Sequence, residues 1–252
     1  MVYHCIKFWV LSKKGIIIFV RNPELGKVKT RLAATVGDQQ ALHIYIELLQ
    51  HTRDVVAQSS HEKFLFYTNE ITIGDLWPEE VFHKSIQSNG DLGDRIKAAF
   101  EYAFESCDSC IIVGSDCPRL SSAHIEQAFQ ALDHHDTVVG PSYDGGYYLI
   151  GMNQYHDRLF QDIPWSTEEV YDRTIARMKK NDLSYKALET LSDVDYEEDW
   201  VKWGWEIWGP RLAYIFSSST VKCRKILACF AMLNPLFNLW LRSCTLAIVA
   251  AT

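Results

Sequence analysis

Carboxylates, cations and glycines gather in this sequence where apolar runs end, a pattern typical of sites for phosphates and metal ions. The clearest case is Gly114-Ser115-Asp116-Cys117-Pro118, which directly follows the apolar run 110–113. A short run bounded by Gly and Pro predicts a buried strand that opens into a loop. Ligands of open α/β sheets bind beyond the carboxyl ends of strands, and a carboxylate oxygen there suits Mg²⁺ or Mn²⁺. Asp116 is therefore a candidate catalytic residue and metal ligand, with capping of a helix near Ser121 as an equal alternative.

Four cations follow the first strongly apolar run. Residues 15–20 predict a buried strand, and the next segment carries Arg21, Lys27, Lys29 and Arg31. These side chains can neutralise a polyphosphate, with the N–H groups of the following helix facing the same anion. The spacing matches neither a Walker loop nor a Gly-x-Gly-x-x-Gly motif. We expect all four cations to bind phosphate, with a solvated basic turn as the alternative.

Two loops combine an acid with glycine. Gly90 and Asp91 stand where a helix begins, and we expect them to contact the nucleotide, unless Asp91 only caps that helix. Asp144 precedes Gly145 and Gly146, whose missing side chains would let a ligand approach the backbone. Asp144 is the second candidate catalytic residue, and a simple Asp-Gly hairpin turn is the competing interpretation.

Aromatic and hydroxyl side chains suggest a pocket for an acceptor. Tyr147 follows the two glycines, and Trp165 and Thr167 stand before an expected helix. We expect these three residues to line the acceptor pocket with Gly145 and Gly146. The alternative is local, because residues 166–169 have the spacing of a capping box.

A second pair of acids follows the last expected strand. Asp193 and Asp195 are separated by one residue, and either could complete a metal site with Asp116. We assign Asp195 as the second metal ligand, against the alternative that it caps the helix that follows.

Apolar runs alternate with helical periodicity, which predicts an α/β fold with a mainly parallel sheet flanked by helices. One helix should carry Leu42, Tyr45, Leu49 and Val56 on its inner face, capped by Asp38. Strands are expected at 15–20, 64–67, 81–86, 110–113, 137–140, 147–151 and 184–188, and further helices from 92, 122, about 170 and 195.

Composition narrows the class of protein. The chain has 252 residues, is 48% hydrophobic and carries a net charge of −7, with all 32 acids before residue 210. Such an acidic body argues against a nucleic-acid binder. Seven scattered cysteines and no signal-peptide pattern lead us to expect a cytoplasmic protein with reduced thiols, including Cys107 and Cys110 packed at a helix–strand junction.

Five motifs in order give the chain a family resemblance. Residues 19–32, 90–95, 114–118, 140–151 and 165–167 resemble the bacterial GT-A-like transferases known as rSAM/selenodomain-associated transferases. The opening also resembles phospholactate guanylyltransferases, and the fold is shared with molybdenum-cofactor nucleotidyltransferases. The resemblance implies a nucleotide-diphospho-sugar transferase fold, a nucleotide-sugar or nucleoside triphosphate donor, a small-molecule acceptor and a divalent metal.

The resemblance leaves the reaction type open. A glycosyltransferase is the first interpretation and a nucleotidyltransferase of the guanylyltransferase kind is the second. A nucleotide-binding regulatory module without turnover is the third, since the Asp-x-Asp of many GT-A enzymes is here Asp116-Cys-Pro, with one acid.

The chain divides into an extension at 1–14, a transferase domain at 15–209 and a tail at 210–252. The tail has five basic residues and no acid, and its uncharged stretch 226–241 is shorter than a membrane-spanning helix. It is interpreted as a weak membrane-surface element, a segment packed on the domain, or a non-native frame after a frameshift.

Overall fold

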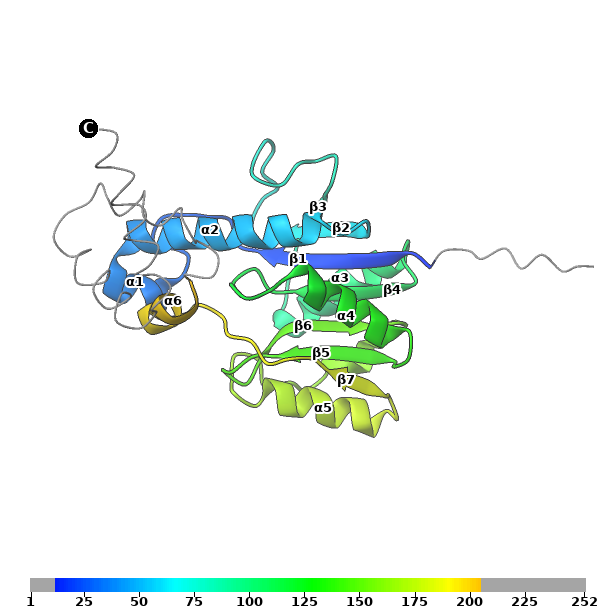
Figure 1. The fold of residues 1–252 in the computed structure, drawn as a ribbon. Coiled ribbons are helices and arrows are strands. Elements are labelled where there is room, and N and C mark those ends of the chain that lie inside the picture. Colours follow the sequence, from blue (N-terminus) through cyan, green and yellow to red (C-terminus); the bar gives the residue numbers. More distant parts are fainter. Residues whose placement is uncertain (1–11, 205–252) are drawn as a thin grey trace, which may run out of the picture.

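A single sheet with helices on both faces forms the body of the protein (Figure 1). The computed structural model describes residues 12–204. Its strands are β1 (Lys14–Val20), β2 (Glu62–Tyr67), β3 (His83–Ile86), β4 (Ser109–Val113), β5 (Thr137–Pro141), β6 (Tyr147–Met152) and β7 (Tyr185–Ala187). Its helices are α1 (Thr30–Val36), α2 (Asp38–Ala57), α3 (Leu92–Phe104), α4 (Ser122–Leu132), α5 (Val170–Lys180) and α6 (Glu197–Trp203), with a 3₁₀ turn η1 (Asp157–Phe160). The expected α/β class is confirmed.

The sheet brings most strand ends to one edge. Its order is β3-β2-β1-β4-β6-β5-β7. Only β6 runs against its neighbours β4 and β5, because the tight turn after β5 reverses the chain; the other described pairings are parallel. The carboxyl ends of six strands and the first residue of β6 therefore share one edge, where a ligand site is expected.

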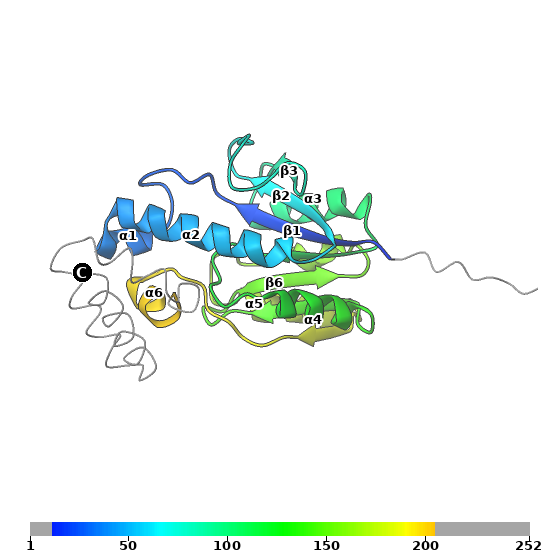
Figure 2. The same cartoon turned by 45° about the horizontal axis from the view of Figure 1, so that its top comes forward.

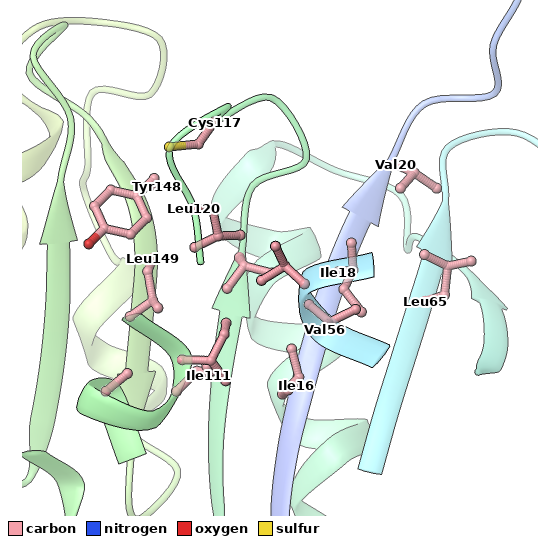
Figure 3. Close-up of a cluster of buried hydrophobic side chains, with 14 of the residues drawn as sticks. Ile16, Ile18, Val20, Val56, Leu65, Ile111, Cys117, Leu120, Tyr148 and Leu149 are labelled. Carbon is pink, nitrogen blue, oxygen red and sulfur yellow. The ribbon is translucent and has the colours of Figure 1, made fainter. Parts of the chain in front are cut away.

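Alternation along β1 supplies a hydrophobic core on each side of the sheet. Ile16, Ile18 and Val20 are buried in the core under α2 and α4, and Figure 3 shows them along β1 with Val56 of α2 facing them. Ile17 points the other way, into the core that α3 and α5 cover. The run at 15–20 is continuously apolar, without polar residues in alternation, because both faces of this strand are buried.

A small third core closes the carboxyl-end edge. Leu32 of α1, Ile44 and Leu48 of α2, and Val194 before α6 pack together, with Trp200 against them. Figures 1 and 2 both place α1 beside α6 at the end of the sheet. We did not predict α1, which has seven residues and no side-chain cap, so it carries too little periodicity to be recognised.

Two predictions about helix caps are wrong. Asp38 is the first residue of α2, and Gly37 is its cap. No capping box forms at residues 166–169, since α5 begins at Val170 without a side-chain cap. The packing role of Cys107 and Cys110 is confirmed: both are buried, and a Cβ on Gly15 of β1 would stand 2.9 Å from the Cys107 Sγ.

Within residues 12–204, no helix is both long and apolar enough to cross a membrane. The tail at 210–252 and most of the extension at 1–14 lie outside the described residues. The three interpretations of the tail, and its boundary at 209, therefore stay predictions.

Candidate functional site

A cavity of about 730 Å³ opens at the carboxyl-end edge of the sheet. Loops after β1, β4 and β5, the start of β6 and the segment after β7 all contribute to its walls. Ten of the residues expected from the sequence line it: Arg21, Lys29, Arg31, Asp116, Asp144, Gly146, Tyr147, Trp165, Thr167 and Asp195.

The cationic side of the cavity is fixed by a tyrosine from α2. The Tyr45 hydroxyl accepts a hydrogen bond from the Arg21 backbone N–H at 2.9 Å and donates one to the Arg21 carbonyl at 3.1 Å. The start of the basic loop is thereby tied to a buried helix. The periodicity of the sequence predicts only a core position for Tyr45, and its hydroxyl among apolar neighbours is the signal for this second role.

Lys29 stands between two carboxylates. Its Nζ donates to Asp116 Oδ2 at 2.9 Å and to Asp195 Oδ1 at 3.1 Å, and its side chain is only 8% exposed. Arg31 donates to the other oxygen of Asp195 at 3.0 Å, and its own side chain stays 62% exposed. Burial alone would lower the pKa of Lys29, but the charges of Asp116 and Asp195 outweigh it and raise that pKa.

The segment after β7 brings its acids to Asp116 through the backbone. The Val194 N–H donates to the Asp116 carbonyl at 3.0 Å, so Asp193 and Asp195 flank a bond to the loop after β4. Asp195 does not cap α6, whose cap is Tyr196, and Asp116 does not cap α4, whose cap is Ser121. Both side chains are engaged with Lys29 instead.

Asp193 carries an unsatisfied oxygen. Its Oδ1 is buried and has no hydrogen-bond partner among residues 12–204. Burial raises the pKa of this carboxyl well above its usual range, and the nearby charges of Asp116 and Asp144 add to the effect. A buried polar oxygen without a partner is costly to keep, and it is an atom that a cation ligand could satisfy.

Asp144 belongs both to the turn between β5 and β6 and to the lining of the cavity. Its Oδ1 accepts from the Ser142 hydroxyl and, at 3.0 Å, from the Gly146 N–H, so the Asp-Gly turn interpretation is confirmed. The same residue also lines the cavity and adds to the negative field at Asp193. A turn role and a site role are therefore compatible in this aspartate.

The opposite wall is aromatic and apolar. Trp165 lies against α3 at Gly93, where a Cβ would stand 2.6 Å from its Nε1. Leu92 and Ile96 of α3 continue this wall. Ser166 next to Trp165 has a positive φ of 64°, and strained backbone of this kind concentrates at functional sites.

Four expected residues do not line the cavity: Lys27, Gly90, Asp91 and Gly145. Lys27 pairs with Glu24 on the surface. Asp91 caps α3 by accepting from the Asp94 N–H at 2.9 Å, as its alternative interpretation stated. Gly145 supports the wall, because its φ of 86° and its contact with the Glu168 backbone leave no space for a side chain.

The donor set fits a hard divalent cation in its chemistry. Asp116, Asp193 and Asp195 offer carboxylate oxygens, and one of these oxygens is buried without a partner. Over the described part of the chain, however, no three acidic, histidine or cysteine side chains already surround a metal-sized position. The Lys29 ammonium lies between two of the donors instead.

Known proteins share this architecture. The family model described as "Uncharacterized protein conserved in bacteria (DUF2064)" matches residues 48–167. A solved structure from Desulfovibrio desulfuricans G20, assigned as a candidate nucleotide-diphospho-sugar transferase, is 30% identical over 86% of this chain and 95% of that chain, with a TM-score of 0.69.

A curated relative points the same way. The 2-phospho-L-lactate guanylyltransferase of Methanocaldococcus vulcanius is 23% identical over 142 residues, which make up 54% of this chain and 60% of that protein. The chain thus spans less than two thirds of this relative.

The near-complete match of this chain to the Desulfovibrio structure, on the fold that the five motifs predicted, shows that the chain belongs to the GT-A-like family of nucleotidyl- and nucleotide-sugar transferases.

Proposed function

We propose that the protein is a metal-dependent transferase that takes a nucleotide-sugar or a nucleoside triphosphate as donor and passes a group to a small-molecule acceptor. The observation that carries this proposal is the meeting of Arg21, Lys29 and Arg31 with Asp116 and Asp195 in one cavity. Cations are needed for the donor phosphates and carboxylates for a metal that shares them.

The phosphates are assigned to the cationic side. Arg31 offers an exposed guanidinium that can hold phosphate oxygens in bidentate fashion, and Lys29 offers a buried point charge. Arg21 enters the same cavity from the end of β1. Neutralising the charge that develops on the leaving phosphate is the main catalytic contribution expected of these side chains.

The metal ion is assigned to Asp116, Asp193 and Asp195. Asp193 extends the expected pair, because its side chain lines the same cavity and its buried Oδ1 has no hydrogen-bond partner among the described residues. A bound Mg²⁺ or Mn²⁺ would polarise the phosphate oxygens and stabilise the leaving group. Asp144 faces the cavity near these acids and is assigned to the metal or to the acceptor.

The acceptor is assigned to the opposite wall. Trp165, Tyr147, Thr167 and Gly146 line this side of the cavity. An indole fixed against α3 can stack on a ring or an apolar group without losing further conformational entropy.

Nucleotidyl transfer is the second candidate, favoured by the guanylyltransferase relative. A screen of nucleotides and nucleotide-sugars by thermal shift, with and without Mg²⁺, identifies the donor. Product analysis with that donor then separates the reactions: pyrophosphate release marks nucleotidyl transfer and nucleoside diphosphate release marks glycosyl transfer. Nucleotide binding without either product would indicate a regulatory module, and no binding at all would refute the proposal.

Asp116→Asn tests the metal assignment directly. The exchange keeps the size of the side chain and removes its charge, so we expect the fold to persist while Mg²⁺-dependent nucleotide binding is lost. Calorimetric titration with and without Mg²⁺ measures this, and the melting temperature controls for folding. Binding equal to that of the wild type would show that Asp116 holds no metal.

A further inference from the structure

The Lys29 ammonium already lies between two of the carboxylates that are assigned to a metal ion. Its Nζ is within hydrogen-bond distance of Asp116 Oδ2 and Asp195 Oδ1, at 2.9 Å and 3.1 Å. Arg31 holds the second oxygen of Asp195. A metal ion that approaches alone therefore meets, at Asp116 and Asp195, oxygens that already have positive partners, and it would have to share a poorly solvated space with an ammonium group.

The backbone at Lys29 adds an independent sign that this arrangement has a function. Lys29 has φ 46° and ψ 47°, in the left-handed region, directly before α1. A residue that bears a side chain is strained there relative to an ordinary conformation. A glycine would relieve this strain, but it would also remove the buried ammonium.

The charges suggest how the arrangement changes when a ligand arrives. A nucleotide alone would bring its phosphates up to the carboxylates of Asp116, Asp193 and Asp195. A divalent cation alone would repel Lys29. Their chelate avoids both costs, because the ammonium can exchange carboxylate oxygens for phosphate oxygens while the carboxylates exchange the ammonium for the metal.

We propose that Lys29 is an internal counter-cation that keeps free divalent metal out of the carboxylate site, so that the protein takes metal and polyphosphate together as one chelate. This inference rests on the proposed function and specifies the form in which the donor is bound. No covalent bond changes in the exchange, which is a transfer of hydrogen bonds and ion pairs. The orphaned oxygen of Asp193 gains a partner only in the loaded state.

Titration of free Mn²⁺ into the full-length protein, followed by electron paramagnetic resonance, tests the proposal without any turnover. We expect weak binding to the wild type and at least tenfold tighter binding to Lys29→Met, which keeps the length of the side chain and removes its charge. Lys29→Gln is a second neutral variant, in case the methionine variant does not fold. Lys27→Met is the matched control, because Lys27 lies outside the cavity and should leave Mn²⁺ affinity unchanged.

Inorganic triphosphate supplies the second arm. Mn²⁺ bound to the wild type should become detectable with triphosphate present, as a signal distinct from that of the free chelate. If the wild type binds Mn²⁺ alone as tightly as the neutral variants, the counter-cation role is overturned while metal-dependent nucleotide binding stands. If the wild type takes up no Mn²⁺ even with triphosphate or with the full nucleotide panel, the proposed function and this inference both fail.

Discussion

Two cations of the same loop differ completely in their surroundings. Arg31 lines the cavity and pairs with Asp195, whereas Lys27 lies on the surface and pairs with Glu24. We expect Arg31→Ala to weaken triphosphate binding by roughly 1.5–3 kcal/mol, the usual value of a charge-assisted contact, and to affect nucleoside binding far less. Lys27→Ala should change neither affinity. Calorimetry with both ligands measures the difference. Equal losses of triphosphate affinity in the two variants would mean that the loop acts through its total positive charge and not through a contact of Arg31.

The buried carboxyl of Asp193 should make the stability of the folded protein depend on pH. Burial raises the pKa of Asp193 in the folded chain, so its carboxyl ionises in the unfolded chain first, as the pH rises above 3.8. The free energy of unfolding therefore falls between that pH and the pKa of the folded state. Each pH unit in this window costs about 1.4 kcal/mol. Asp193→Asn should therefore stabilise the metal-free protein, and by more at about pH 8 than at about pH 5.

Urea denaturation in chelator at the two pH values measures this effect. The same variant should bind a metal–nucleotide complex more weakly, since a charged ligand of the cation is lost. A gain in stability that does not depend on pH would show that Asp193 is ionised to the same extent in the folded and unfolded chains.

At the scale of elements, the tight turn 142–146 forms one unit with the first turn of α5 and the segment that leads into it. The Tyr171 N–H donates to the Gly145 carbonyl at 2.8 Å, and a Cβ on Gly145 would stand 2.5 Å from Glu168 Cα. Through this contact, the turn that carries Asp144 is fixed to the segment that carries Trp165. The acid and the aromatic wall of the cavity are thus positioned together.

Gly145→Ala should break this unit, and Gly74→Ala is its control. Both glycines have positive φ, 86° and 68°, but nothing lies within 4 Å of a Cβ on Gly74. We expect Gly74→Ala to cost about 1–2 kcal/mol for the left-handed conformation alone, and Gly145→Ala to cost more because backbone atoms must move. Chemical denaturation compares the two, and similar losses would mean that the turn adjusts freely.

The sequence was sufficient for elements that bury a periodic or continuous apolar pattern. The run 15–20 and the helix with Tyr45 and Leu49 were predicted because burial imposes such patterns. The short helix α1 was not, since seven residues make too few turns. The partners of Lys29 were beyond prediction as well, because Asp116 and Asp195 are 87 and 166 residues away and only the strand order brings them together.

On the scale of the whole molecule, every described strand of the sheet and all walls of the cavity lie within residues 14–195. A chain that ends after Gly209 should therefore fold cooperatively and keep the nucleotide affinity of the full chain. It should also be more soluble, because the segment removed is apolar and basic. Denaturation and calorimetry on both lengths check this.

Binding to vesicles of anionic lipid can be compared between the full chain and the shortened chain as well. Binding by the full chain that the shortened chain lacks would support a membrane-surface tail. Failure of the shortened chain to fold would mean that the tail belongs to the core and that the boundary at 209 is wrong.

The order of the strands also bears on how the molecule behaves in a crowded solution. The two outermost strands, β3 and β7, have four and three residues. Each carries a lysine, and Lys84 of β3 is held by Asp75 and Glu79 while Lys186 of β7 is exposed. Short edges with charged side chains offer a poor template for another chain, so aggregation by edge-to-edge strand addition is disfavoured at both ends of this sheet.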